Sequence, residues 1–235
     1  MPSDDMSDRN PDLESPFNKL PVVVVVLFLI MAGVEAVLAL GEAGLVGGPS
    51  AIGWRLGLVR DWGFSGDLFD AMWADGFFPL EHMARFLTYP FIHLSFTHAL
   101  LAVVLMLALG KMAAEVMGPL AMLALFVLSG IGGALAYAFL LDDPVWLVGA
   151  YPSVYGLIGG YSFLIWRRLE GTGRKQLEAF TLIGMLMALQ LVWSLFGSVG
   201  NGWVAELAGF FCGFFLCFIC APGEWARLLR RMRDR

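Results

Sequence analysis

Three histidines and a few hydroxyl and carboxyl groups are the side chains of this chain that could do chemistry. The histidines are His82, His93 and His98, and none lies further along the sequence. A serine nucleophile needs an adjacent base, so His93 or His98 beside Ser153 would suggest a hydrolytic site. The same two histidines with Glu206 also resemble a two-histidine, one-carboxylate metal set. The residues alone therefore leave a hydrolytic site and a metal site as alternatives.

The composition predicts the surroundings of any such site. Hydrophobic residues make up 59% of 235 positions and charged residues only 15%, whereas a soluble domain carries about a quarter charged residues. The sequence thus predicts an all-α membrane protein. Its basic residues sit in loops and at the C-terminus rather than on one face, so we expect no nucleic-acid partner. Cys212, Cys217 and Cys220 share one apolar run and are interpreted as small hydrophobic residues.

Six segments have the length and apolarity expected of membrane spans, which need about 20 residues. The segment 153–166 is short and contains glycines, so its outer end is predicted to stop in a protein-lined cavity. Residues 41–91 form a long loop that we expect to lie at the membrane interface, because its tryptophans suit the headgroup level. Glu35, the single carboxylate of the first span, is expected to be solvated near the outer surface. The six predicted spans are 21–40, 91–113, 119–141, 153–166, 177–196 and 203–221.

Charge predicts the orientation of the spans. Of the 15 Lys and Arg residues, only Arg55, Arg60 and Arg85 would lie outside if the N-terminus is cytoplasmic. This gives an acidic cytoplasmic segment 1–20, a six-span membrane domain 21–221 and a basic cytoplasmic tail 222–235. The N-terminus lacks the basic start and cleavage site of a signal peptide. A multi-pass protein with both termini inside, in a bacterial inner membrane, is the predicted localisation.

A glycine-rich motif near the middle of the chain adds a family resemblance. Residues 149–159 read GAYPSVYGLIG, and they resemble the motif that carries the nucleophilic serine of rhomboid intramembrane proteases. His93 and His98 resemble that family's H-x4-H motif in the second span, and Arg85 resembles the arginine of its first-loop Trp-Arg pair. The resemblance covers most of the chain and implies a rhomboid-like six-helix bundle with a large interfacial first loop.

The resemblance also implies that the catalytic positions are degenerate, with none intact. Tyr151 stands at the nucleophile position, and Glu206 stands where the family's sixth-span histidine would be. Pro152, next to the nucleophile position, has no backbone N–H to donate to an oxyanion, and Ala102 replaces an asparagine donor. Ala84 replaces the tryptophan before the first-loop arginine. The resemblance implies hydrogen-bonding roles for His93 and His98, so we predict no metal and no cofactor.

The glycines of the same motifs are retained. Small residues four apart let helix backbones approach closely in lipid, and this packing would bring Tyr151 and Glu206 together. We expect a hydrogen bond between them, with His93 or His98 as another partner for Glu206, or a water-exposed Glu206 as the alternative. The helix-packing glycines are Gly149, Gly156, Gly159, Gly160, Gly209 and Gly213.

These observations predict a rhomboid-like protein that lacks the Ser-His dyad. Its expected function is that of a pseudoprotease, which binds transmembrane helices as an adaptor or as an assembly or quality-control factor. An active intramembrane serine endopeptidase and an accessory subunit of a larger membrane complex are the alternatives. Its partners would be membrane lipids and transmembrane helices of client or partner proteins. The span 177–196, with Met185 and Met187, offers an adaptable apolar surface for such helices.

Overall fold

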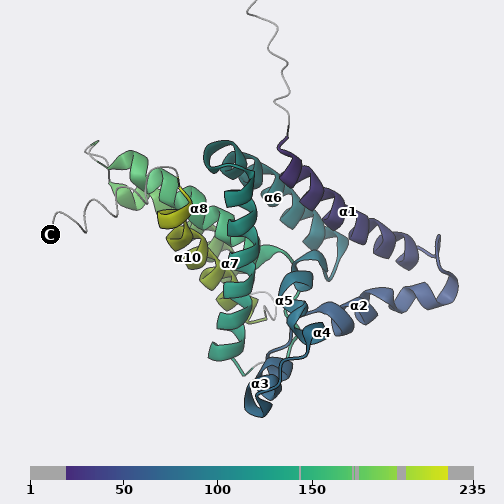
Figure 1. The fold of residues 1–235 in the computed structure, drawn as a ribbon. Coiled ribbons are helices and arrows are strands. Elements are labelled where there is room, and N and C mark those ends of the chain that lie inside the picture. Colours follow the sequence, from purple (N-terminus) through teal and green to yellow (C-terminus); the bar gives the residue numbers. More distant parts are fainter. Residues whose placement is uncertain (1–19, 143, 171, 173–174, 195–199, 222–235) are drawn as a thin grey trace, which may run out of the picture.

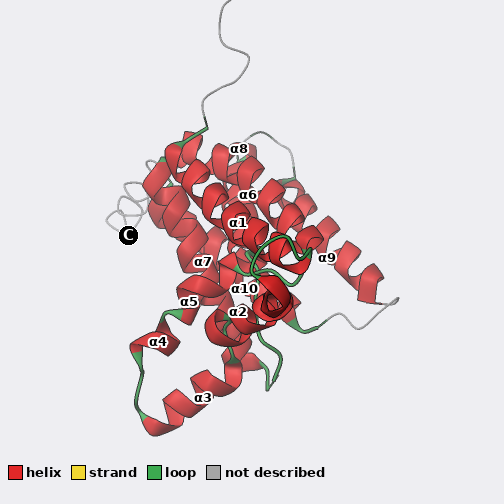
Figure 2. Cartoon of the chain, turned by 90° about the vertical axis from the view of Figure 1, so that its right-hand side faces the viewer, coloured by secondary structure: helices red, strands yellow, loops and turns green. Residues whose placement is uncertain are grey.

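The computed structural model describes residues 20–142, 144–170, 172, 175–194 and 200–221, and this part of the chain is almost entirely helical (Figures 1 and 2). The longest helices form a bundle, and short helices fill the loop after the first of them. The elements are α1 (Val22–Glu42), η1 (Gly48–Gly53), α2 (Trp54–Trp62), α3 (Gly66–Asp75), α4 (Leu80–Met83), α5 (Arg85–Thr88), η2 (Tyr89–Phe91), α6 (Phe96–Met117), α7 (Pro119–Leu140), α8 (Tyr151–Leu169), η3 (Gln176–Phe180), α9 (Thr181–Ser194) and α10 (Gly202–Cys220).

Four of these helices, α1, α6, α7 and α10, are long and apolar enough to cross a membrane. A helix also stands at each of the other two predicted spans. α8 has 19 residues but includes polar positions and two arginines in its last turn, and α9 has only 14 residues. The chain is therefore a helical membrane protein, and the count of six spans and the orientation of the termini remain predictions.

The boundaries of three helices differ from the prediction. α9 begins at Thr181 rather than near residue 177, because the residues before it form the 3-10 helix η3. α6 begins at Phe96 rather than near residue 91, because the Ser95 hydroxyl accepts the backbone N–H of His98 and caps the helix there. His93 therefore lies in the segment before the helix and not within it. α8 is longer than predicted, because Pro152 suits a first helical turn and the arginines at the other end suit its last turn.

Helices α7, α8 and α10 pack with their backbones unusually close. A Cβ atom added at Gly213 would collide with the carbonyl oxygen of Gly156, and one at Gly209 would collide with that of Pro152. A Cβ at Gly159 would collide with the Phe210 carbonyl oxygen in the same way. Only glycine permits this approach, which holds the amino ends of α8 and α10 side by side.

The first helix is attached differently. α1 contacts α6 and reaches α2 and η1 at its far end, and Figure 1 shows it leaning away from the other long helices. The Arg55 side chain of α2 fills the junction and binds Glu35 and Glu42 of α1. Glu35 is only 5% exposed, so the expectation of a solvated residue was wrong, and Glu35 is a buried ion-pair member.

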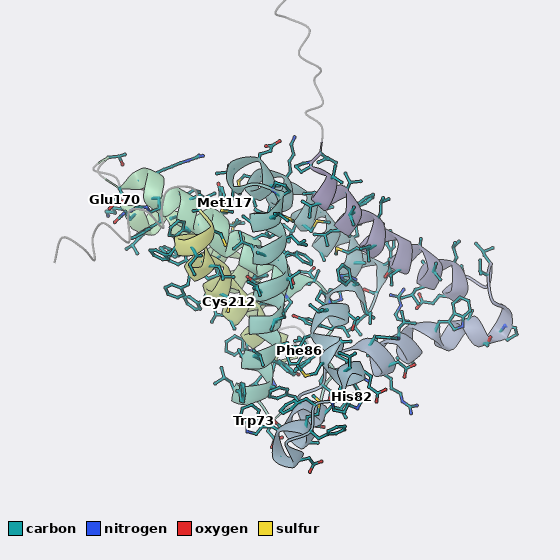
Figure 3. The ribbon with its side chains drawn as sticks, in the orientation of Figure 1. Trp73, His82, Phe86, Met117, Glu170 and Cys212 are labelled. Atoms are coloured by element: carbon teal, nitrogen blue, oxygen red, sulfur yellow. The ribbon has the colours of Figure 1, made fainter. Side chains whose placement is uncertain are left out.

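The loop of residues 43–95 is fastened to the end of α7 and to the segment before α8. Phe64 and Leu147 exchange backbone hydrogen bonds of 3.0 and 2.8 Å in an isolated β-bridge. Phe64 also lies 4.7 Å from Phe86, ring centroid to ring centroid. Figure 3 places Phe86 and Trp73 at this end of the molecule and Met117 and Glu170 at the opposite end. Trp73 is 62% exposed, which is compatible with the predicted interfacial position.

Candidate functional site

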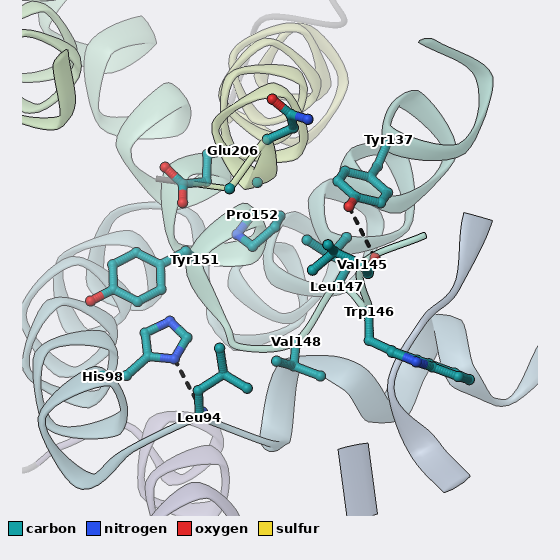
Figure 4. A pocket seen from close by; sticks show the side chains of 13 residues that line it. Leu94, His98, Tyr137, Val145, Trp146, Leu147, Val148, Tyr151, Pro152 and Glu206 are labelled. Atoms are coloured by element: carbon teal, nitrogen blue, oxygen red, sulfur yellow. Dashed lines mark hydrogen bonds between the residues drawn. The ribbon is translucent and has the colours of Figure 1, made fainter. Parts of the chain in front are cut away.

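A pocket of about 230 Å³ opens where α8 and α10 begin. Its walls come from the amino ends of both helices, from α6, from α7 and from the segment that precedes α8 (Figure 4). Four of the five residues that the sequence placed around a cavity line this pocket: His98, Tyr151, Pro152 and Glu206. The fifth, His93, is 1% exposed and lies behind the wall.

Tyr151, the first residue of α8, occupies the position that the resemblance assigns to a nucleophile. Its ring stacks on His98, with ring centroids 5.0 Å apart and an interplanar angle of 11°. In Figure 4 the Tyr151 hydroxyl points away from Glu206. A parallel stack of this kind uses the ring as packing surface, so the Tyr151 ring closes one side of the pocket.

His98, which forms this stack with Tyr151, and the neighbouring His93 both accept hydrogen bonds from the backbone. His98 accepts the Leu94 N–H at its Nδ1 atom over 3.3 Å, and His93 accepts the Ala150 N–H at Nε2 over 3.4 Å. A nitrogen that accepts such a bond carries no proton, so both rings are neutral in this arrangement. Their role is to hold the segments before α6 and α8, which agrees with the hydrogen-bonding role that the resemblance implied.

Glu206 lies in the second turn of α10, and its carboxylate reaches the pocket (Figure 4). The side chain of Tyr155, one turn along α8 from Tyr151, lies close enough to this carboxylate to interact with it. Tyr155 is 3% exposed, so this interaction is on the buried side of Glu206. The sequence suggested Tyr151 as the partner and did not suggest Tyr155, although both tyrosines lie on the α8 side of the α10 contact.

Ser153, the serine considered as an alternative nucleophile, and Ala102 are both buried. Ser153 is fully buried, and a Cβ atom on Gly130 of α7 would lie 2.5 Å from its hydroxyl oxygen. Ala102 is also fully buried in the hydrophobic core, and neither residue lines the pocket. Pro152 does line it, with a nitrogen that has no proton to donate. A substrate carbonyl in the pocket would therefore meet neither the Ser153 hydroxyl nor a donor at Pro152.

Arg85 links the long loop to the wall of the pocket. One guanidinium nitrogen donates to the carbonyl oxygens of Arg60 and Gly63 over 2.8 and 2.9 Å, and the group lies 5.3 Å from the centre of the Trp146 ring. Burial lowers the pKa of Arg85, and the charges of Asp61 and Glu81 oppose that effect. Ala84, the residue before Arg85, has no aromatic ring, and Trp146 from the segment before α8 lies beside Arg85 instead. No local motif indicates this pairing.

Arg55 of α2 connects α1 with the segment before α6, and no motif in the sequence indicates this connection. Its guanidinium donates to Glu35 over 2.8 and 3.0 Å, to Glu42 over 2.6 and 3.1 Å, and to the His93 carbonyl oxygen over 2.7 Å. Hydrogen bonds to Glu35 first, and then to Glu42, raise the pKa of Arg55. The available signal was a lone glutamate in an apolar helix, which needs a buried partner. Through His93, this network supports the backbone at Ala150.

No group of three or more metal-ligating side chains comes together in the described ranges of the chain. The nitrogens of His93 and His98 that accept backbone protons are not available as ligands. The three cysteines, which all lie on α10, are free, and the Cys217 sulfur contacts the Met117 sulfur at 3.8 Å.

Comparison with known proteins assigns the chain to a family. A family model described as a rhomboid domain matches residues 80–223, which include α6 to α10 and every wall of the pocket. A search among curated proteins finds no match. Because the family model covers more than half of the chain, this helical membrane protein belongs to the rhomboid family.

Proposed function

We propose that the protein is a rhomboid pseudoprotease, which binds transmembrane helices of client proteins without cutting them. The observation that carries this proposal is the set of side chains that line the pocket. At the nucleophile position stands a tyrosine ring stacked on His98, and at the base position stands Glu206, which interacts with Tyr155. Acyl transfer needs a nucleophile, a base and oxyanion donors that face one point, and these side chains do not bring a serine or cysteine nucleophile, a base and oxyanion donors to one point.

The retained part of the structure supports a binding role. Close glycine packing of α7, α8 and α10 forms a rigid wall, whereas α9 has fewer neighbours. α9 contacts α8 and η3, and Figure 2 shows it leaning out from the bundle. Met185 on this helix is 62% exposed, while Met187 packs against the core. A client helix would enter beside α9, as the family resemblance implies for a substrate, and would rest with its end at the pocket.

The proteolytic alternative is tested directly. The full chain in lipid nanodiscs is incubated with a labelled transmembrane peptide, and both binding and cleavage are measured, with Ser153→Ala as the matched variant. We expect binding by both forms and cleavage by neither. Cleavage by the parent chain that Ser153→Ala abolishes would overturn the proposal, because it would show that the buried serine reaches a substrate.

Photocrosslinking separates an adaptor from an accessory subunit. A photoreactive amino acid at position 185 faces outward on α9, whereas the same group at Met31 of α1, which is fully buried, is the matched control. Capture of many different membrane proteins from position 185 agrees with an adaptor. Capture of one partner in equal amount would overturn the adaptor role and favour the subunit.

A further inference from the structure

We propose that Arg55 is a positioning residue for helix binding, because it fixes the backbone of one wall of the pocket from outside that pocket. This inference rests on the proposed function and assigns a part in it to a residue that is not among the described lining residues. Arg55 lies on α2 and is only 6% exposed. It reaches the pocket through His93, which lies behind the wall and is 1% exposed.

The guanidinium group of Arg55 joins α2 to two other segments. Its N–H donors lie in one plane with fixed directions, and together they make five hydrogen bonds. Two go to Glu35 and two to Glu42, both on α1, and the fifth goes to the His93 carbonyl oxygen over 2.7 Å. Lysine has fewer donors and no planar fork. One arginine side chain therefore fixes the His93 backbone relative to α1.

Apolar packing leaves α1 and α2 partly separated at this junction. Arg55 directly follows Trp54, and Glu35 directly follows Val34. Trp54 and Val34 face an open groove, so the polar contacts cross the junction where apolar contact is incomplete. The position of α2 against α1 therefore depends on Arg55. The groove has a volume of about 300 Å³ and is lined by Gly33, Val34, Val37, Leu38, Trp54 and Leu58.

His93 passes this constraint to the wall of the pocket in two ways. Its Nε2 atom accepts the Ala150 N–H over 3.4 Å, and Ala150 lies between Val148 and Tyr151, which both line the pocket. The His93 ring also meets the His98 ring edge to face, with centroids 5.3 Å apart. His98 in turn stacks on Tyr151. A shift of His93 would therefore move both the backbone of this wall and the ring that closes its side.

These contacts link the first membrane span to the pocket. α1 packs on α6 and leans away from the other long helices (Figure 1), and none of its residues line the pocket. Because Glu35 and Glu42 hold Arg55, a change in the tilt of α1 would move Arg55, His93 and the wall together. Close-packed segments transmit such shifts. Helix binding should therefore depend on the position of α1.

The test removes the Arg55 connection without leaving a buried charge unpaired. Arg55→Met with Glu35→Leu removes both buried charges, and the Glu42 side chain is 44% exposed. Amide hydrogen exchange of residues 147–150 and affinity for the labelled transmembrane peptide are measured on the full chain in nanodiscs. We expect about tenfold faster exchange and about tenfold weaker binding, the size of one lost hydrogen bond to a charged group. Exchange at the α8–α10 glycine contact should not change.

Two further variants test the route. Arg60→Ala, at an exposed arginine of the same helix, is the matched control and should change neither quantity. His93→Phe keeps a ring beside His98 but cannot accept the Ala150 N–H. In a chain that carries His93→Phe, the Arg55 and Glu35 substitutions should add less than about a twofold change, because the two sites act through one connection.

Unchanged exchange at residues 147–150 in the Arg55 and Glu35 variant would overturn the inference and leave helix binding intact. Faster exchange throughout the chain would overturn it too, because it would show a general loss of stability rather than a local effect. The same holds for faster exchange without weaker binding, and for a full additional effect in the His93→Phe chain. Failure of the parent chain to bind the peptide would overturn the proposed function as well.

Discussion

The two sides of the molecule are held together by opposite means. Helices α7, α8 and α10 join through glycines, with backbone against backbone and without a charged group at these glycine contacts. Helix α1 joins the loop and the segment before α6 through one guanidinium and two carboxylates. Close packing defines positions tightly and tolerates no added atom. A buried ion pair adds a polar connection to the apolar packing of α1 on α6, and it fails when one partner is lost.

The largest effect should follow a change at the glycine contact. Gly213→Leu places a side chain where even a Cβ atom collides with the Gly156 carbonyl oxygen, so α8 and α10 must separate. We expect no folded protein to be recovered after detergent extraction, as judged by size-exclusion chromatography and thermal unfolding. Gly33→Leu is the control, because nothing lies within 4 Å of a Cβ at Gly33 on α1. Equal recovery of the two variants would mean that α8 and α10 are not in close contact.

The second largest loss of stability should follow removal of Arg55, on the side of the molecule that contains α1. Arg55→Ala leaves the Glu35 carboxylate buried without its partner, which costs about 3–5 kcal/mol. The measurement is the free energy of unfolding in one detergent. Arg60→Ala, at an exposed arginine of the same helix, should change it by less than about 0.5 kcal/mol. A double variant, Arg55→Met with Glu35→Leu, should recover most of the loss, because it removes both buried charges.

The smallest effect should distinguish the two tyrosines of α8. Tyr155→Phe removes a buried hydroxyl that interacts with the Glu206 carboxylate and should cost about 1 kcal/mol of unfolding free energy. Tyr151→Phe keeps the stack on His98 and should change that free energy by less than about 0.5 kcal/mol. The reverse order would show that Tyr151 is the partner of Glu206, as the sequence suggested.

The two sides also differ in how far the sequence could predict them. Glycines four apart identify a helix contact within a short stretch of sequence, so the spacing alone assigns Gly156, Gly209 and Gly213 to helix packing. The spans α1, α7 and α10 could be placed within two residues at each end. These features are determined by residues that are close together in the sequence of one helix. The local sequence pattern is therefore sufficient to predict them.

Contacts between distant segments could not be predicted in this way. Arg55 was counted only as a positive charge for orientation, yet it binds Glu35 and the His93 carbonyl oxygen. Trp146 belongs to no motif, and the glycine-rich motif that contains Tyr155 does not indicate Glu206 as its neighbour. Arg85 and Glu206 are remote in sequence from these two residues. Tyr151 lines the pocket, but its rotamer, stacked on His98, depends on the local backbone of two separate segments.

The bridge between Phe64 and Leu147 has a consequence for the order of biosynthesis. The loop that contains Phe64 emerges from the ribosome well before Leu147, Trp146 and helix α7, which supply its backbone pairing and its aromatic partners. Until those segments are inserted, the aromatic side chains of the loop have only one another, lipid or solvent around them. The loop must therefore complete its fold late, after much of the membrane bundle has been made, although it is encoded early.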